Sequence, residues 1–195
     1  MYAYLKGKLT YKSPTQVYIE CAGVGYQVNI TLFTYSDIER EEDTKLFTYL
    51  HVREDALLLY GFSTIVERDM FMLLVSVSGI GTNTARLILS SMTTNDFARA
   101  IINEEVSLIQ TIKGIGPKSA KRLVLELKDK VGSMNSGDAA EVVAGSGERI
   151  IDEAVAALTM LGFAKPQSEK AIRKVWQSNP VESVEELIKL SLKNL

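Results

Sequence analysis

The chain has 195 residues, of which 46% are hydrophobic and 24% are charged, and its formal net charge is −2. This composition is typical of a soluble globular protein with one ordinary domain or two to three small ones. No apolar run is long enough to cross a membrane and the first residues do not resemble a secretory signal, so we expect a cytoplasmic protein. A dedicated nucleic-acid binder is usually basic overall, so any such surface must be local here.

The chain contains one cysteine, Cys21, and one histidine, His51. A single cysteine excludes an intrachain disulfide, and the two residues together are too few for a His/Cys metal cage. His51 lies in the apolar segment 46–52, where we expect a half-buried strand residue and not a catalytic base. The sequence therefore predicts no metal, no cofactor and no catalytic residue.

Residues 1–62 predict a small β-barrel. Turn signals at Ser13-Pro14, at Gly23-Val24-Gly25 and in the charged run 37–43 separate segments rich in β-branched and aromatic residues. Five short strands with a longer insert before the fourth favour an OB-fold, although a fold alone does not assign a function. The expected strands are residues 2–11, 16–21, 26–32, 45–52 and 57–62.

Residues 63–131 change to helical spacing and contain an internal repeat. Residues 76–86 and 111–121 align with each other. Each stretch has the end of an apolar helix, then Gly-Ile-Gly, then a second helix with an alanine at its fourth position, Ala85 or Ala120, and a cation after it. A single Gly-x-Gly is usually only a turn, whereas two copies at a fixed offset are the signature of a double helix-hairpin-helix domain.

The two hairpins predict a phosphate-binding surface. Their glycines permit positive φ and remove the Cβ atoms that would hold a phosphate away, while the isoleucine between them packs back between the helices. Consecutive amide N–H groups and the N-terminus of the next helix form an anion-binding concavity. Such contacts reach the DNA backbone and read no bases. The expected contacts are Gly79, Ile80, Gly81, Thr82 and Asn83 in the first hairpin, and Gly114, Ile115, Gly116, Lys118, Ser119, Lys121 and Arg122 in the second.

The hairpins also differ from each other and from a nucleotide site. The first carries Thr82-Asn83-Thr84 and no lysine, so its grip must rely on backbone amides. In the second, Pro117 and Thr111 depart from the P-loop pattern, so we expect no ATP site and assign any motor to a partner.

Residues 132–147 predict a flexible linker, because seven of these sixteen residues are glycine or serine. Residues 148–195 predict three short helices: the first ends at Gly162, the second lies between Pro166 and Pro180, and the third begins at Ser183. Ser183 and Glu186 match a capping box. The expected fold class is therefore α+β and multidomain, with an OB-fold barrel, a double helix-hairpin-helix domain and a three-helix, UBA-like domain whose thin core favours docking over catalysis.

Together these segments resemble the RuvA family of bacterial Holliday-junction branch-migration subunits over essentially the whole chain. The matching stretches are residues 23–26, 52–56, 59–62, both Gly-Ile-Gly hairpins and residues 156–163. The resemblance implies a non-catalytic homotetramer, one or two per junction, that holds a four-way junction open. It implies the hexameric ATPase RuvB as a partner and the resolvase RuvC as a second candidate.

The resemblance also implies roles for residues outside the hairpins. It places an acidic pin at Glu54 and Asp55, where carboxylates would repel the crowded phosphates at the junction centre. It places a motor-docking face at Leu158, Leu161 and Phe163. From the residues alone, two carboxylates at a turn are usually just solvated, and Leu158 fits a helix core equally well.

Two other functions stay open at this point. A helix-hairpin-helix DNA glycosylase or lyase needs an aspartate held on a structured element soon after the second hairpin. The candidates are Asp129, in a lysine-rich helix end, and Asp138, in the predicted linker. A general DNA-binding module without junction preference would also use both hairpins.

Overall fold

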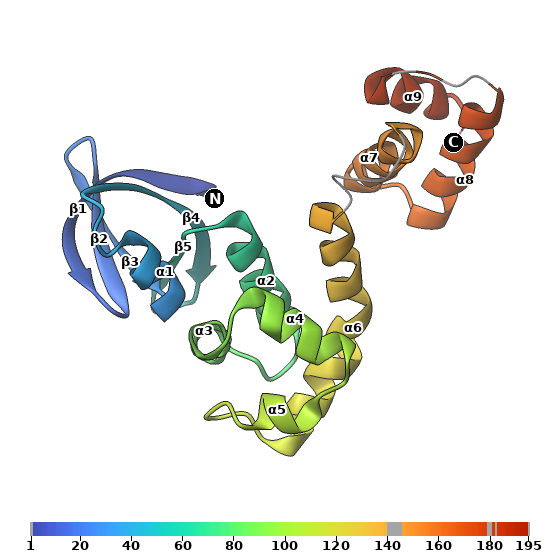
Figure 1. The fold of residues 1–195 in the computed structure, drawn as a ribbon. Helices are drawn as coiled ribbons and strands as arrows, with labels where there is room; N and C mark the ends of the chain where they lie inside the picture. Colours follow the sequence, from blue (N-terminus) through green and yellow to red (C-terminus); the bar gives the residue numbers. More distant parts are fainter. Residues whose placement is uncertain (1, 140–145, 179–180, 182, 195) are drawn as a thin grey trace. The chain divides into compact units, whose positions relative to one another are not determined.

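A computed structural model describes residues 2–139, 146–178, 181 and 183–194. The chain divides into two compact units, Met1–Met134 and Asn135–Leu195. The first unit holds a β-barrel and the helices of both hairpins, and the second holds a three-helix domain (Figure 1). Among these described ranges, no helix has the length and apolar character needed to cross a membrane.

The five predicted strands form a closed barrel, which confirms the predicted fold of the N-terminal segment. Their order around the barrel is β1-β2-β3-β5-β4, and β4 pairs back onto β1. All neighbours are antiparallel except β3 and β5, which are parallel. The strands are β1 (Tyr4–Ser13), β2 (Gln16–Cys21), β3 (Val24–Ile30), β4 (Asp43–Val52) and β5 (Leu57–Phe62).

Two connections of the barrel refine the sequence prediction. The turn expected at Gly23-Val24-Gly25 is instead Ala22-Gly23, with φ of 50° and 84°, and Val24 and Gly25 pair with β2. Two successive residues with positive φ make the tight turn that matches strand twist. The insert before β4 forms a short helix, α1 (Leu32–Ile38), whose N-terminus is capped by Thr31.

Five further helices follow the barrel: α2 (Ile65–Ser76), α3 (Thr82–Ser91), α4 (Thr94–Ile102), α5 (Val106–Gln110) and α6 (Pro117–Ala139). They share a core with the barrel, because the buried Phe71 of α2 lies against three barrel aromatics. Its ring centroid is 5.5 Å from Tyr49, 5.1 Å from Tyr60 and 4.9 Å from Phe62. The boundary expected after residue 62 thus marks a change of secondary structure inside one compact unit.

The two compact units divide within the linker predicted over residues 132–147, but the described part of this segment is helical and not coil. Helix α6 continues to Ala139, and α7 already begins at Ser146. Residues 140–145 of the prediction lie outside the described residues. Extending a helix that already exists adds one hydrogen bond per residue and needs no new nucleus, so scattered glycines and serines do not end it.

The C-terminal unit confirms the predicted three helices: α7 (Ser146–Met160), α8 (Lys165–Ser178) and α9 (Val184–Ser191). Helix α7 ends at Met160, and Gly162, two residues further on, has a φ of 99°. The Phe163 N–H donates to the Leu158 carbonyl at 3.1 Å and the Gly162 N–H to Thr159 at 3.0 Å, a pattern that closes helix C-termini. Ser183 caps α9 by accepting a hydrogen bond from the Glu186 N–H at 3.2 Å.

Candidate nucleic-acid interface

The two hairpins repeat the same backbone hydrogen bonds. In each, the isoleucine N–H donates to the carbonyl three residues earlier, and the alanine N–H donates to the carbonyl of the second glycine. The donor-acceptor distances are 3.0 Å for Ile80–Val77, 3.1 Å for Ile115–Ile112, 2.9 Å for Ala85–Gly81 and 3.0 Å for Ala120–Gly116. The sequence repeat is therefore also a repeat of backbone geometry.

The glycines leave open space at the start of each helix. Gly79 and Gly114 have φ of 88° and 89°, so only glycine fits there without strain. Gly81 caps α3 with an ordinary φ of −85°, and no side chain caps that helix. A Cβ at Gly81 or Gly116 would meet nothing within 4 Å. Neither backbone strain nor a neighbouring atom of the unit requires a glycine at these second positions. An anion does require it, because a side chain there would keep the anion away from the free amides of the helix N-terminus.

The isoleucines and alanines of the repeat belong to the core. Ile80 and Ile115 are each 5% exposed, and Ala85 and Ala120 are fully buried. The predicted inward packing of the isoleucines is confirmed, so Ile80 and Ile115 offer a ligand only their backbone groups. The neighbouring glycines, together with Asn83, are exposed.

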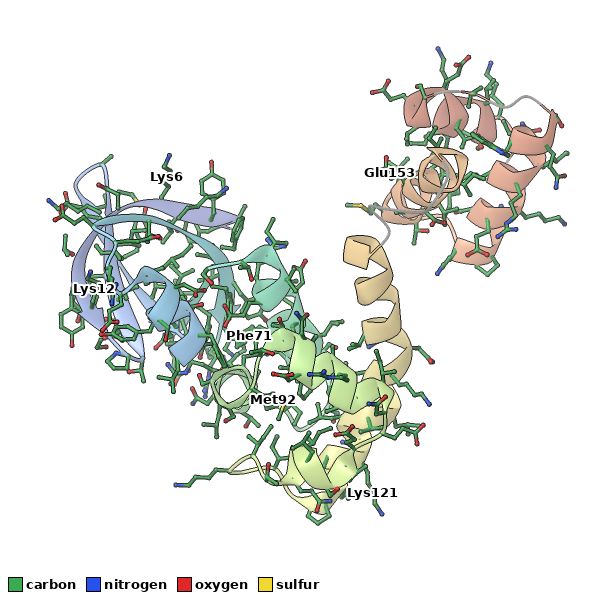
Figure 2. All side chains as sticks on the ribbon, viewed as in Figure 1. Lys6, Lys12, Phe71, Met92, Lys121 and Glu153 are labelled. Atoms are coloured by element: carbon green, nitrogen blue, oxygen red, sulfur yellow. The ribbon has the colours of Figure 1, made fainter. Side chains whose placement is uncertain are left out.

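Positive charge lies at the second hairpin. Lys113, Lys118 and Lys121 are exposed, and none of them pairs with a carboxylate of residues 2–131. Lys121 projects from α6 into solvent, and Ser119 beside it is half-buried (Figure 2). Arg86, the cation of the first hairpin, points toward the barrel instead. Its Nη1 donates to the Thr15 carbonyl of the barrel at 3.2 Å.

Two of the predicted phosphate contacts have side chains that bond to other groups of the protein. Thr82 is 9% exposed, and its Oγ1 accepts a hydrogen bond from the Tyr60 hydroxyl at 3.0 Å. Arg122 donates from Nη1 to the Ser78 carbonyl at 3.0 Å, and its Nε lies 3.7 Å from Glu126. Both contacts join residues far apart in the sequence, so no local pattern indicated them.

The predicted acidic pair lies at the tip of the β4–β5 connection. Glu54 and Asp55 are exposed, and a hydrogen bond of 2.8 Å from the Arg53 N–H to the Ala56 carbonyl closes the turn. The Asp55 carboxylate is 3.4 Å from Arg53 Nε, and both side chains are more than half exposed. The turn therefore presents carboxylates to solvent with one cation beside them.

The predicted docking residues of the C-terminal unit separate into two groups. Leu158 is fully buried in the core of its unit, so its prediction as a surface contact is wrong: its position on α7 faces inward. Phe163 is half-buried, and Leu161 is 63% exposed. Met160, which the sequence reading missed, is 89% exposed. It lies off the helical spacing of the core residues, and that spacing could have indicated it.

The two aspartates that a glycosylase or lyase could use lie at an exposed position or outside the described side chains. Asp129 lies on an exposed position of α6, and the side chain of Asp138 is outside those described. Over the described ranges, no three histidine, cysteine or acidic side chains gather where they could hold a metal ion. His51 is half-buried in β4 with its ring 6.3 Å from that of Tyr49, which confirms the expected strand position.

A closed barrel, two glycine hairpins of the same geometry and a small helical unit define a multidomain protein of the tandem helix-hairpin-helix class. Family models match in the same order: "RuvA N terminal domain" over residues 1–61, "SAM-like Helix-hairpin-helix tandem" over 71–129 and "RuvA, C-terminal domain" over 149–195. The chain is 44% identical to the Holliday junction branch migration complex subunit RuvA of Bacteroides thetaiotaomicron, and 45% identical to those of Christiangramia forsetii and Flavobacterium psychrophilum, with 100% of both chains covered each time. The chain belongs to the RuvA family.

Proposed function

We propose that this chain binds the backbone of four-way junction DNA through its two hairpins and acts as a non-catalytic scaffold in branch migration. The observation that carries the proposal is the open space at Gly81 and Gly116, beside the N-termini of α3 and α6, where a Cβ would meet no protein atom within 4 Å. The printed names of the relatives, Holliday junction branch migration complex subunits, supply the DNA structure concerned.

The two hairpins bind phosphate by different means in this proposal. At the second, the exposed Lys118 and Lys121 attract the DNA backbone and displace its counterions. At the first, the backbone amides near Gly79 and Gly81 bind the phosphate, and the positive end of the α3 dipole strengthens this binding. All of these contacts are with the DNA backbone, which carries no base information, so binding follows DNA shape and not base sequence.

The β4–β5 turn adds the element that distinguishes a junction from a simple duplex. Glu54 and Asp55 form an acidic pin that repels phosphates at the point where four strands cross. The repulsion is small in open water but grows where DNA and protein exclude solvent. Arms that are kept apart favour the open junction over the stacked one.

The proposal includes an assembly that matches the ligand. Four copies in a ring give each arm of the junction an equivalent subunit, because closed cyclic symmetry repeats one surface around one axis. One or two such tetramers would hold the DNA. The exposed Met160 and Leu161, with Phe163 beside them, form the face that recruits the ATPase RuvB, and RuvC is a further candidate partner.

Substituting the second glycines tests the proposal directly. Gly81→Val and Gly116→Val place a side chain in space that is empty in the free protein, so thermal stability should change little. Affinity for a synthetic four-way junction should fall about tenfold or more, because the side chain keeps phosphate from the amides and each charged hydrogen bond contributes ~1.5–3 kcal/mol. Unchanged affinity in a folded variant would overturn the phosphate assignment.

The same binding assay separates the alternatives. Wild-type chain should bind the junction more tightly than linear duplex of the same sequence. Equal affinity would favour a general DNA-binding module. Release of a base from damaged duplex by the purified chain alone would favour a glycosylase or lyase, and we expect none.

A further inference from the structure

The two hairpins share one backbone geometry but differ in charge. The second has three exposed lysines around it, whereas residues 76–85 of the first contain no lysine or arginine. A site made only of backbone amides attracts phosphate through partial charges, which pull less strongly than the full charge of a lysine. It gains affinity when its donors are already held in the bound arrangement, since no ordering cost then remains for the binding step.

The first hairpin is held on one side by the barrel. Thr82 directly follows Gly81 and is the first residue of α3, and its Oγ1 accepts the hydroxyl hydrogen of Tyr60 at 3.0 Å. Tyr60 is 2% exposed, and its ring packs on Phe71 at 5.1 Å, so the hydroxyl comes from a rigid support. This bond fixes the first turn of α3 against β5.

The same hairpin is held on its other side by α6. Arg122 Nη1 donates to the carbonyl of Ser78 at 3.0 Å, and Glu126 lies 3.7 Å from the Nε of the same guanidinium. In a planar trans peptide the C=O and the following N–H point in opposite directions. Fixing the Ser78 carbonyl toward Arg122 therefore directs the Gly79 N–H away from α6.

The second hairpin lacks both supports. The position that matches Thr82 is Pro117, which has no hydroxyl, and the position that matches Ser78 is Lys113. Over residues 2–129, no side chain donates a hydrogen bond to the Lys113 carbonyl. Side-chain support therefore occurs at the first hairpin, whereas lysine charge occurs at the second.

We propose that Tyr60 and Arg122 are positioning residues, which hold the first hairpin's amides ready for phosphate and so replace the lysines that this hairpin lacks. The inference rests on the proposed function and deepens it, since it assigns Arg122 to the hairpin instead of to DNA. Tyr60 and Arg122 lie on different elements and flank Gly79 and Gly81 on either side.

Three variants test the inference in the full-length chain. Tyr60→Phe removes one oxygen and keeps the ring, and Arg122→Gln removes the guanidinium. Lys121→Gln is the matched control, because it removes one charge from the neighbouring position of the same helix. For each, we would measure junction affinity at several salt concentrations, thermal stability, and the methyl order parameters of Ile80 and Ile115 by NMR.

We expect Tyr60→Phe and Arg122→Gln each to weaken junction binding about threefold to tenfold, the range set by loss of one supporting hydrogen bond. The slope of log affinity against log salt should stay at the wild-type value. The Ile80 order parameter should fall while that of Ile115 stays unchanged. Lys121→Gln should lower the salt slope by about one per chain and leave both isoleucines as they were.

The outcomes separate this inference from the proposed function. If Arg122→Gln lowers the salt slope as Lys121→Gln does and leaves the order parameter of Ile80 unchanged, Arg122 is a phosphate contact and the inference is wrong. If Tyr60→Phe changes neither junction affinity nor the order parameter of Ile80, the barrel does not position the hairpin. If Gly81→Val also leaves affinity unchanged, the first hairpin does not bind phosphate at all.

Discussion

At the scale of single residues, a buried carboxyl joins the barrel to the hairpin helices. Glu67 of α2 is 5% exposed and accepts hydrogen bonds from the Thr31 hydroxyl at 2.5 Å and the Thr34 hydroxyl at 2.7 Å. Burial raises the pKa of Glu67 above its usual value, the two threonine hydrogen bonds oppose that rise, and nearby Asp37 adds to it. Thr31 and Thr34 belong to the start of α1, so this contact links α1 to α2.

The raised pKa predicts how stability depends on pH. The folded chain keeps the Glu67 proton where the unfolded chain has released it. The free energy of unfolding should therefore fall as pH rises from 4.5 through the folded-state pKa, and level off above it. Glu67→Gln should remove this part of the slope, as urea unfolding between pH 4 and 8 would measure. A slope equal to that of the wild type would contradict the assignment.

A second substitution measures the hydrogen bonds themselves. Glu67→Ala leaves the buried Thr31 and Thr34 hydroxyls without their acceptor and should lower the free energy of unfolding by about 2–3 kcal/mol. Glu67→Gln keeps one acceptor oxygen and places an NH2 donor where the other oxygen was, from which a threonine hydroxyl can accept, so its cost at neutral pH should be at most about 1 kcal/mol.

At the scale of elements, one face of α3 is bonded to the barrel. Thr82, Arg86 and Ser90 are spaced four residues apart, which places them on one side of a helix. Thr82 bonds to Tyr60, Arg86 to the carbonyl of Thr15, and the Ser90 hydroxyl accepts the Leu32 N–H at 3.2 Å. The spacing of these polar residues is visible in the sequence, but their partners lie in the barrel and in α1, far away along the chain.

The β4–β5 turn carries the prediction at this scale. Glu54→Gln combined with Asp55→Asn should leave thermal stability unchanged, because both side chains are exposed. If the carboxylates repel phosphates at the crossover, junction geometry, measured by energy transfer between labelled arms, should change more than affinity does. An equal rise in affinity for junction and linear duplex would mean that the pair only adds like charge.

At the scale of the whole molecule, the proposed partner contact lies on the second compact unit and the proposed DNA contacts lie on the first. Its core buries Leu158, whereas Met160 and Leu161 are 89% and 63% exposed at the end of α7. Exposed apolar side chains that adjoin each other mark partner contacts more often than isolated ones do. This pair sits beside Gly162, whose positive φ ends the helix abruptly and leaves the two side chains uncovered.

The corresponding prediction concerns the motor. Met160→Asp combined with Leu161→Asp should weaken binding to the ATPase by about tenfold or more, since hot-spot residues cost at least ~2 kcal/mol, while junction binding stays unchanged. Leu192→Asp is the matched control, because Leu192 is also an exposed leucine, at 43%, on the same unit. Pull-down with the purified ATPase measures the effect, and equal loss in both variants would contradict a specific docking face.

Features of short range were available in the sequence alone. The β-branched and aromatic strand segments, the repeated Gly-Ile-Gly, the helix stop at Gly162 and the cap at Ser183 each depend on neighbours a few residues away, and the structure confirms them. The extension of α6 to Ala139 was missed, because composition reports which residues break helices but not whether a preceding helix continues through them.

Only the tertiary structure decided which way the functional side chains face. Thr82 and Arg122 looked like phosphate contacts in the sequence, yet they bond to Tyr60 and Ser78, and Leu158 turned inward. The packing of the barrel on Phe71 likewise joined two predicted domains into one unit. A linear pattern fixes the backbone geometry of a hairpin, but which partners its side chains meet depends on elements that approach only when the chain folds.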